Sequence, residues 1–388
     1  MTVRTRTALV ASLVLAIAAG PVAASPVFAA SPSLAASVAH PDDEALRAAI
    51  AGLPDADATA ALVRVAGTDG SWRGSNGVAE TGSGRKALEQ GRFRAGSTTK
   101  VFTAAVVLQL AAEHRIDLGA PVQDYLPGLL PDGPPISVRQ LLNHTSGLQE
   151  AHDDKPFAEA YEHRFDTVTP RQLVAASAAK PREFAPGTQQ HYVGVNYTLL
   201  GLLIEKTTGD SYEQQVSRRV LGPLGLRHTS FPGTDPRIHG PHNHGYQAVK
   251  NSDGTTELRD VTQWNVSDVW ATGNLISTTA DLERFLHALF RGQVVPEAQL
   301  REMFTVPQGI PLYGSDQPAT YSAGLTRFTL RDGTVGWGKT GGLYGYNTAV
   351  LAARDLSRTL VYSVNSTDAK GRDMNKVVGR IISAAFTR

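Results

Sequence analysis

The stretch GSTTKVFTAAVVLQLAAEHRIDL, residues 96–118, places a Ser-x-x-Lys spacing directly before a strongly apolar helical pattern. From Val101 onward the apolar residues cover most of the helix circumference, which is typical of a helix buried on all sides rather than of an amphipathic surface helix. The stretch therefore predicts a buried helix that runs to about residue 118, with Ser97 and Lys100 at its N-terminal end.

Strand-like segments lie on both sides of this helix in the sequence. ALVRVAG and SWRGSNGVAE, separated by Thr68-Asp69-Gly70, predict a hairpin before it. The segments YSAGLTRFTL, TVGWGKT, YNTAVLAAR and RTLVYSVNS, and then a final helix, follow toward the C-terminus. Between these two groups, helical patches alternate with Pro- and Gly-containing loops. We expect one α/β domain from about residues 40–120 and 261–388, with a mostly helical insertion at about 121–260.

The composition is that of a globular protein with little net charge. Of the 388 residues, 41% are hydrophobic, and the formal net charge is +1. Because no basic run exceeds the Arg218-Arg219 pair, we expect no nucleic-acid partner. The chain has no cysteine, so disulfides, thiol nucleophiles and thiolate metal sites are excluded.

The first 29 residues have the features of a secretory signal peptide. Arg4 and Arg6 precede an apolar stretch that a Gly-Pro pair interrupts, and small residues around Ala29 offer a cleavage site. A membrane anchor would instead need about 20 unbroken apolar residues. We expect a secreted, extracellular protein of residues 30–388 without a membrane anchor.

A second motif, GTVGWGKTGG at residues 333–342, begins with the pattern of a nucleotide-binding phosphate loop. Such a loop must follow a strand and open a helix, because the helix N-terminus supplies amide donors to the phosphates. Here Asp332-Gly333 predicts a hairpin turn, and the residues on both sides of the motif's end predict strands. We therefore expect no nucleotide. Lys339-Thr340-Gly341 suits instead a Lys-Thr-Gly strand beside a Ser-x-x-Lys nucleophile.

The Ser-x-x-Lys spacing occurs three times, at residues 83–86, 97–100 and 177–180. The first lies in a polar, Gly-containing stretch and the third at the end of a helix closed by proline, so both predict ordinary surface serines. Ser97 instead lies at a helix N-terminus, where its own N–H is free to donate. Desolvation of Lys100 would favour the neutral amine, which can accept the serine proton. The alternative is a helix-capping serine followed by a lysine that extends to solvent.

Longer segments extend the pattern: FRAGSTTKVFTA, RQLLNHTSGL, FAPGTQQHYVGVNYTLLGLLIEKTTG, RVLGPLGLRHTSF, ATGNLISTTADLERF and GKTGG. In this order they resemble the penicillin-recognising serine hydrolases related to class C β-lactamases, in particular the secreted D-alanyl-D-alanine carboxypeptidase branch. The resemblance covers the chain from about residue 40 to its end. It implies an α/β (α+β) fold with an antiparallel sheet flanked by helices, a mostly helical region, and the active site between them.

The resemblance also implies a role for four side chains. Ser97 is similar to the nucleophile that the substrate carbonyl acylates, and Lys100 to its proton partner. Tyr192 matches the tyrosine that exchanges protons with the nucleophile and the leaving group. Lys339 matches the basic residue that keeps the pKa of this tyrosine low and attracts a substrate carboxylate. The resemblance implies no metal and no cofactor.

Substrate binding is assigned by the same resemblance to Thr340, Gly341 and Gly342. Thr340 would hydrogen-bond the substrate carboxylate. The backbone N–H groups of Ser97 and Gly342 would form an oxyanion hole, which is commonly worth a few kcal/mol to the transition state. This family role replaces the phosphate-loop interpretation of the same letters.

One position departs from the family pattern. Where the family has Tyr-x-Asn, this chain has Tyr192-Val193-Gly194, so an amide expected to contact the acyl side chain is missing. Asn196, two residues later, is expected to cap the following helix. We expect acyl transfer to survive this loss, because the nucleophile, base and oxyanion hole are intact. The departure leaves the identity of the substrate open.

The expected activity is that of a secreted serine hydrolase that forms an acyl-enzyme on Ser97. Removal of the terminal D-alanine from peptidoglycan stem peptides is the preferred reaction, with β-lactams as candidate inhibitors. The alternatives are a β-lactamase-like carboxylesterase, a D-amino-acid-specific amidase or endopeptidase acting on another small acyl substrate, and a penicillin- or peptidoglycan-binding protein without turnover. His239, His242 and His244 could hold a metal by spacing, but a solvated loop without an acidic partner is expected there.

Overall fold

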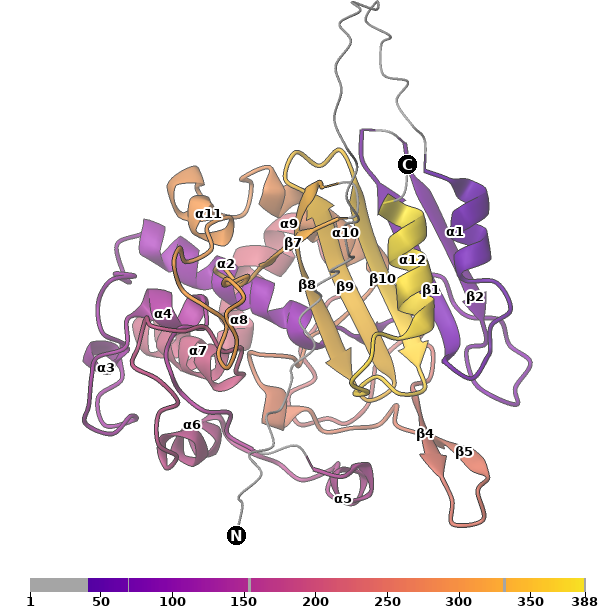
Figure 1. Cartoon of the computed structure of the whole chain (residues 1–388), viewed down its shortest axis with the longest axis horizontal. Coiled ribbons are helices and arrows are strands. Elements are labelled where there is room, and N and C mark those ends of the chain that lie inside the picture. The colour runs from indigo at the N-terminus through magenta and orange to yellow at the C-terminus, as the bar shows by residue number, and fades with distance from the viewer. Residues whose placement is uncertain (1–40, 69, 153–154, 331–332, 387–388) are drawn as a thin grey trace, which may run out of the picture.

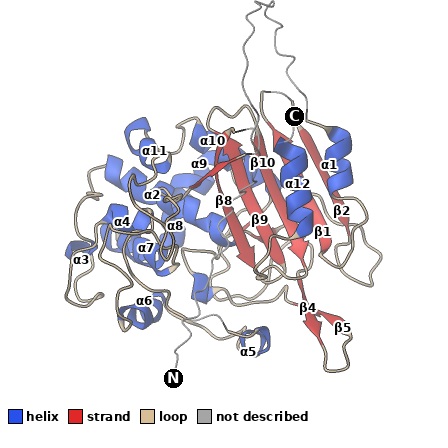
Figure 2. Cartoon of the chain, viewed as in Figure 1, coloured by secondary structure: helices blue, strands red, loops and turns tan. Residues whose placement is uncertain are grey.

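A six-stranded antiparallel sheet forms the main layer of the computed structural model (Figures 1 and 2). The structure describes residues 41–68, 70–152, 155–330 and 333–386. The expected signal peptide therefore lies outside the described residues. The strands are β1 (Ala58–Ala66), β2 (Trp72–Gly77), β7 (Thr326–Thr329), β8 (Val335–Leu343), β9 (Tyr346–Ala353) and β10 (Thr359–Ser366). Their order is β2-β1-β10-β9-β8-β7, so the N-terminal hairpin joins the C-terminal strands, as expected.

Helices cover both faces of this sheet. On one face lie α1 (Asp43–Ala49) and α12 (Lys376–Phe386), and on the other lies α10 (Thr279–Phe290) (Figure 1). Leu46 of α1, Ile381 of α12 and Tyr362 of the sheet belong to one cluster of buried side chains. Burial of each large apolar side chain contributes about 1.5–3 kcal/mol, so this layer fixes the sheet on which the site is built.

The remaining elements form a mostly helical region beside the sheet (Figure 2). Its helices are α2 (Thr99–Ala112), α3 (Val122–Tyr125), α4 (Val138–Leu142), α5 (Phe157–Glu162), α6 (Pro170–Ala178), α7 (Val195–Thr208), α8 (Tyr212–Val216), α9 (Gly222–Leu224) and α11 (Glu297–Met303), with the short turns η1 (Gly96–Thr98), η2 (Ser217–Leu221) and η3 (Ser267–Val269). Two short strand pairs, β3 (Phe93–Arg94) with β6 (Ile276–Ser277) and β4 (Tyr246–Lys250) with β5 (Thr256–Asp260), complete it. The β4–β5 hairpin lies in the segment for which only helices and loops were predicted. Among the described residues, no helix combines the length and apolarity needed to cross a membrane.

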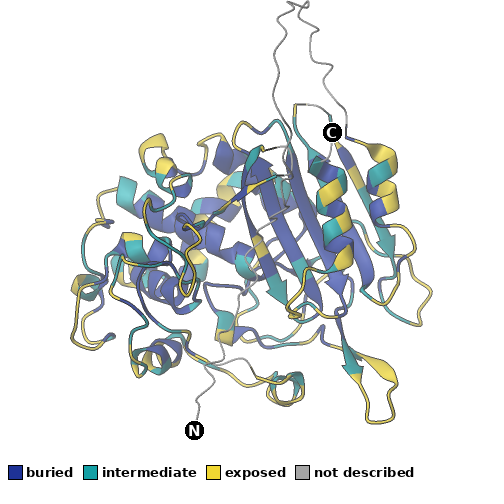
Figure 3. Ribbon diagram, in the orientation of Figure 1, coloured by how far each residue is buried: buried dark blue, intermediate teal, exposed yellow. Residues whose placement is uncertain are grey.

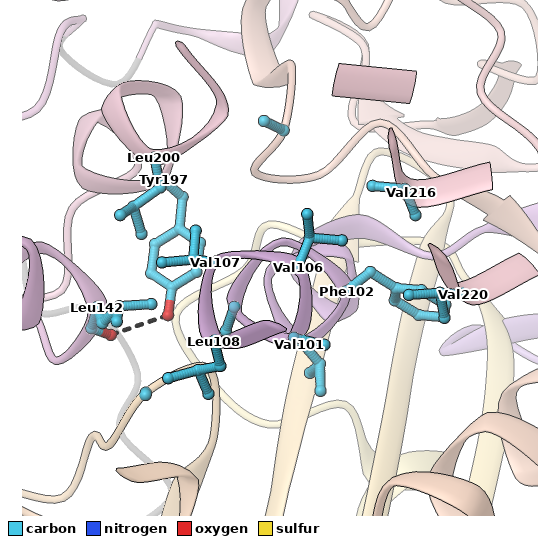
Figure 4. Close-up of a cluster of buried hydrophobic side chains, with 14 of the residues drawn as sticks. Val101, Phe102, Val106, Val107, Leu108, Leu142, Tyr197, Leu200, Val216 and Val220 are labelled. Atoms are coloured by element: carbon cyan, nitrogen blue, oxygen red, sulfur yellow. Dashed lines mark hydrogen bonds between the residues drawn. The ribbon is translucent and has the colours of Figure 1, made fainter. Parts of the chain in front are cut away.

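The predicted buried helix is α2, and it lies in the largest cluster of buried apolar side chains (Figures 3 and 4). Side chains around its whole circumference are buried, and α7 packs against it. The helix ends at Ala112 rather than near residue 118, because His114 adopts a positive φ of 56° and Arg115 N–H donates back to Leu110 O at 2.9 Å. The prediction was therefore right about the burial of this helix and wrong about its C-terminal end.

Candidate active site

Ser97 and Lys100 lie at the N-terminal end of α2, as the sequence predicted. Lys100 Nζ is 3.2 Å from Ser97 Oγ and donates a hydrogen bond to Thr272 O at 2.9 Å. The Lys100 side chain is only 2% exposed. The N-cap of α2 is Thr98, not Ser97. A capping serine followed by a solvent-extended lysine is therefore excluded.

Burial sets the protonation of Lys100. Desolvation, and then the neighbouring Lys339 charge, holds the pKa of Lys100 well below its usual value, while the Glu150 carboxylate acts in the opposite direction. The unprotonated amine is thereby favoured 3.2 Å from the Ser97 hydroxyl. This is the arrangement that general-base activation of a serine requires.

Tyr192 lies between the two lysines. Its ring centroid is 5.0 Å from Lys100 Nζ and 4.6 Å from Lys339 Nζ. The hydroxyl is buried and makes no hydrogen bond of standard geometry with the described residues, although Ser97 is close enough to act on its pKa. Burial raises the pKa of Tyr192 well above its usual value, and the Ser97 side chain opposes this rise. The expectation that Lys339 keeps this pKa low is wrong, because desolvation dominates and Lys339 lies against the face of the ring. Tyr192 is thus a proton donor in the free enzyme.

Lys339 is buried on β8, whereas the Thr340 side chain next to it is exposed. Lys339 Nζ donates to Thr340 O at 2.9 Å. Burial lowers the pKa of Lys339 to about 7. Thr340 is therefore free to contact a ligand from solvent, while Lys339 can supply a positive charge beside Tyr192 near neutral pH.

Replacement of Lys339 by methionine should stabilise the fold and impair catalysis. An unfolded lysine titrates near 10.4, so between pH 7 and 10.4 the unfolded chain holds a proton that the folded chain has lost, and stability rises with pH in this window. We expect Lys339→Met to raise the free energy of unfolding at pH 7 by about 1–3 kcal/mol, a gain that shrinks toward pH 10. Denaturant titrations at both pH values measure this, with exposed Lys86→Met as the control. A Lys339→Met protein less stable than the parent at pH 7 would contradict it.

Glycines allow β8 to lie directly against the nucleophile turn. A Cβ at Gly341 would lie 2.1 Å from Ala95 O and 3.0 Å from Ser97 N. A Cβ at Gly96, whose φ is +53°, would lie 2.8 Å from Gly342 N. No side chain fits at either glycine, so both are required for this approach.

The register of the β8–β9 hairpin directs one backbone donor at this turn. Leu343 and Tyr346 flank a two-residue turn and form a hydrogen-bonded pair, so the next pair, Gly342 and Asn347, is a non-hydrogen-bonded one. The Gly342 N–H therefore points away from β9 and toward η1. This position beside Ser97 N is the one that an oxyanion hole needs, in agreement with the role expected for Ser97 and Gly342.

His144 positions Tyr192, and the sequence did not predict this role. Val193 N–H donates to His144 Nδ1 at 3.4 Å, and His191 N–H donates to His144 O at 3.0 Å, so both neighbours of Tyr192 are held by one residue. The His144 and Tyr192 ring centroids are 4.5 Å apart. Asn196 Nδ2 also donates to His144 Nδ1, at 3.2 Å. Asn196 is buried inside α7, whose N-cap is Gly194, so the expected capping role of Asn196 is wrong.

Glu150 occupies the space next to Gly194. A Cβ at Gly194 would lie 3.1 Å from Glu150 Oε2 and 3.3 Å from Oε1. The Glu150 carboxylate accepts hydrogen bonds from Gly194 N–H and from Ala151 N–H. It also acts on the pKa values of Lys100 and Tyr192. A carboxylate, rather than an amide, therefore stands where the Tyr-x-Asn side chain would begin. No sequence signal indicated this, because 44 residues separate Glu150 from Gly194.

Two other predictions need correction. Ser177 is buried, and its hydroxyl donates to Gln149 O at 2.6 Å, so it is not a surface serine. The histidine loop does have acidic partners, since His239 pairs with Asp235 and His244 with Asp260. Within the part of the chain that the structure describes, no group of three or more His, Asp or Glu side chains could hold a metal ion.

Comparison with known families identifies the fold and the chemistry together. The Beta-lactamase family profile matches residues 28–381, which include all the catalytic candidates. The chain belongs to the β-lactamase family. This membership confirms the expected antiparallel sheet with flanking helices and the serine hydrolase chemistry of the superfamily.

Individual relatives of this β-lactamase-family chain differ in what they do. A D-stereospecific amidohydrolase from Streptomyces sp. is 34% identical, with a TM-score of 0.77 over 89% of this chain and 99% of its own. The putative penicillin-binding protein PbpX of Bacillus subtilis is 28% identical over 59% of this chain and 55% of its own. Esterase EstB of Burkholderia gladioli is 32% identical over 47% and 50%. The chain thus spans about half the length of these two curated relatives.

Proposed function

We propose that this β-lactamase-family chain is a serine amidohydrolase that cleaves amides of D-amino acids carrying a free α-ammonium group. The observation that carries this proposal is the Glu150 carboxylate beside Gly194. Each of its oxygens accepts one backbone N–H and keeps a further lone pair. A substrate ammonium group can bind there by a charge-assisted hydrogen bond, which a neutral N-acyl group cannot make.

The reaction follows from the protonation states of the site. Neutral Lys100 takes the Ser97 proton as Oγ bonds to the amide carbonyl carbon, and the N–H groups of Ser97 and Gly342 donate to the oxyanion. As the C–N bond breaks, Tyr192 gives its proton to the leaving nitrogen and regains one from Lys100. Water then adds to the Ser97 ester and gives a proton to Lys100. That proton returns to Ser97 as the ester bond breaks and the acid leaves.

Similarity supports the amide substrate and its configuration. The D-stereospecific amidohydrolase from Streptomyces matches almost its full length to this chain, whereas PbpX and EstB match about half of theirs. D-alanyl-D-alanine carboxypeptidase activity is the second candidate, because the exposed Thr340 beside Lys339 suits a substrate carboxylate. An N-acylated stem peptide offers no ammonium to Glu150, so the two reactions can be distinguished.

Replacement of Glu150 by glutamine tests the proposal. Glutamine keeps an oxygen to accept from the backbone but loses the charge, so kcat/KM for D-alanine amide should fall about 10- to 100-fold, chiefly through KM. The N-acetylated amide serves as the matched control, and its hydrolysis should change less than about threefold. If parent and Glu150→Gln proteins hydrolyse the amide equally, Glu150 does not bind the ammonium group and that part of the proposal is wrong. If the parent acts only on N-acylated D-alanyl-D-alanine peptides, the carboxypeptidase replaces the amidase.

A further inference from the structure

Four half-exposed aromatic side chains meet beside the site in what we call the aromatic wall: Phe157, Tyr161, Trp264 and Tyr344. The Trp264 and Tyr344 ring centroids are 4.8 Å apart, those of Phe157 and Tyr344 are 5.2 Å apart, and those of Tyr161 and Trp264 are 6.3 Å apart. They come from three separate segments: α5, the segment before η3, and the β8–β9 turn. None of the steps derived above uses these rings, and apolar groups that gather at a partly exposed position favour a ligand of the same kind.

Each of these segments follows or precedes a residue of the active site in the sequence. Tyr344 follows Gly342, the oxyanion donor, by two residues, and α5 lies near this end of β8 (Figure 1). The segment that begins with Trp264 continues through η3 to Thr272, whose carbonyl accepts from Lys100. The chain that leads into α5 begins at Glu150. The aromatic wall therefore adjoins the Gly342 end of β8, and Lys370, whose Nζ lies 5.9 Å from the Tyr344 ring centroid, is close enough to Lys100 to lower its pKa.

Backbone hydrogen bonds and a cation–π contact hold the Trp264 segment and the Tyr161 ring of the wall in place. The backbone N–H of Trp264 donates to Pro236 O at 2.9 Å, and the backbone N–H of Asn265 donates to Arg164 O at 2.8 Å. The Arg164 guanidinium lies 3.9 Å from the centroid of the Tyr161 ring. Rings fixed in this way can bind a partner without a large loss of conformational entropy.

The charges near the wall restrict what it can bind. Arg164 and Arg259 both lie over Tyr161, the latter at 5.3 Å, and Lys370 Nζ lies 5.9 Å from the Tyr344 ring centroid. Arg259 is paired with Glu257, so a cationic side chain placed here would meet chiefly the positive charges of Arg164 and Lys370. A neutral aromatic side chain would instead stack on Trp264 and Tyr344, a contact worth more than its buried area alone.

We propose that the aromatic wall binds the neutral aromatic side chain of the substrate's acyl group, so that D-phenylalanine-type amides are preferred to D-alanine amide. This inference rests on the proposed amidase function for the identity of the scissile bond. It adds a second point of recognition: Glu150 holds the ammonium group and the wall holds the side chain.

Amide hydrolysis by parent and variant proteins tests the wall. The parent should hydrolyse D-phenylalanine amide at least about tenfold better in kcat/KM than D-alanine amide. Trp264→Ala and Tyr344→Ala should each remove most of this preference by lowering kcat/KM for the aromatic amide, with the alanine amide changed less than about threefold. Leu88→Ala is the control, since Leu88 is a large apolar side chain that is 39% exposed and is not part of the wall. Its preference should equal that of the parent.

Two outcomes separate the wall from the amidase proposal. If the parent hydrolyses both amides equally and the wall variants leave their ratio unchanged, the wall inference is wrong and the amidase stands. If the parent hydrolyses neither amide, the amidase proposal is wrong, and the wall is tested with 4-nitrophenyl phenylacetate against 4-nitrophenyl acetate. A preference for the phenylacetate that Trp264→Ala abolishes supports the wall there, and an unchanged ratio overturns it. Thermal unfolding of each variant excludes misfolding as the cause.

Discussion

Replacement of Ser97 by alanine should lower kcat/KM for any amide or ester substrate by at least about 10⁴-fold. The reason is that Ser97 Oγ forms the covalent bond in the acyl-enzyme, and no other described nucleophile lies against Lys100 Nζ at hydrogen-bonding distance. The fold should be kept, because a short turn rather than Ser97 side-chain capping begins α2. Initial rates with D-alanine amide and with 4-nitrophenyl acetate measure the loss.

Ser83→Ala is the matched control for this result. Ser83 has the same spacing to a lysine, but it is exposed and its hydroxyl donates to Glu80 O at 2.8 Å. The activity of the Ser83→Ala variant should equal that of the parent. Retention of more than about 1% of activity in Ser97→Ala would contradict the assignment of the nucleophile. Absence of turnover in the parent with every amide and ester would favour the binding protein without turnover.

Replacement of Lys100 by either methionine or arginine should lower kcat by about 10³- to 10⁴-fold. Methionine has no basic nitrogen, and arginine cannot lose its proton in proteins. Both variants therefore lack the neutral amine 3.2 Å from Ser97 Oγ. Because the pKa of Lys100 is held well below its usual value, the parent should keep its activity at neutral pH and lose it as pH falls through that pKa. Profiles of kcat/KM against pH measure this acid limb.

The Lys100→Arg variant distinguishes two possible roles of Lys100, as a general base and as a positive charge alone. If the lysine acts only by its charge, arginine should retain activity within about tenfold of the parent, and that outcome would contradict the base assignment. Lys86→Met is the control, since Lys86 has the same spacing to a serine as Lys100 but is exposed. We expect Lys86→Met to keep the acid limb of the parent.

Local sequence patterns predicted those parts of the molecule that depend on nearby residues. Alternating apolar residues gave the strands that pair as β1, β2, β8, β9 and β10, and the all-round apolar helix became α2. The end of α2 was missed because it depends on the left-handed conformation of His114, a non-glycine residue that carries no turn signal of its own. The β4–β5 hairpin was missed because its exposed strand, β5, has little apolar alternation.

The sequence motifs of the candidate site could be predicted, but the burial and the long-range contacts of its side chains could not. Ser97, Lys100, Tyr192 and Lys339 come together as the resemblance implied. The high pKa of Tyr192 depends on burial, which the surrounding sequence does not report. Glu150 reaches Gly194 only through the packing of a loop against the start of α7. Contacts of this kind join residues far apart in the chain, so they leave no local pattern in the sequence.

The most direct test of the account is the mass of the Ser97 peptide after reaction with the 4-nitrophenyl ester of D-phenylalanine. The good leaving group makes deacylation the slower step, so the acyl-enzyme should accumulate and survive an acid quench. We predict that the peptide containing Ser97 gains the mass of one phenylalanyl group with the D-ester and not with its L-enantiomer. Three results would contradict a D-selective amidohydrolase that works through Ser97: a mass increase on a peptide without Ser97, an equal mass increase from both enantiomers, or no mass increase during turnover.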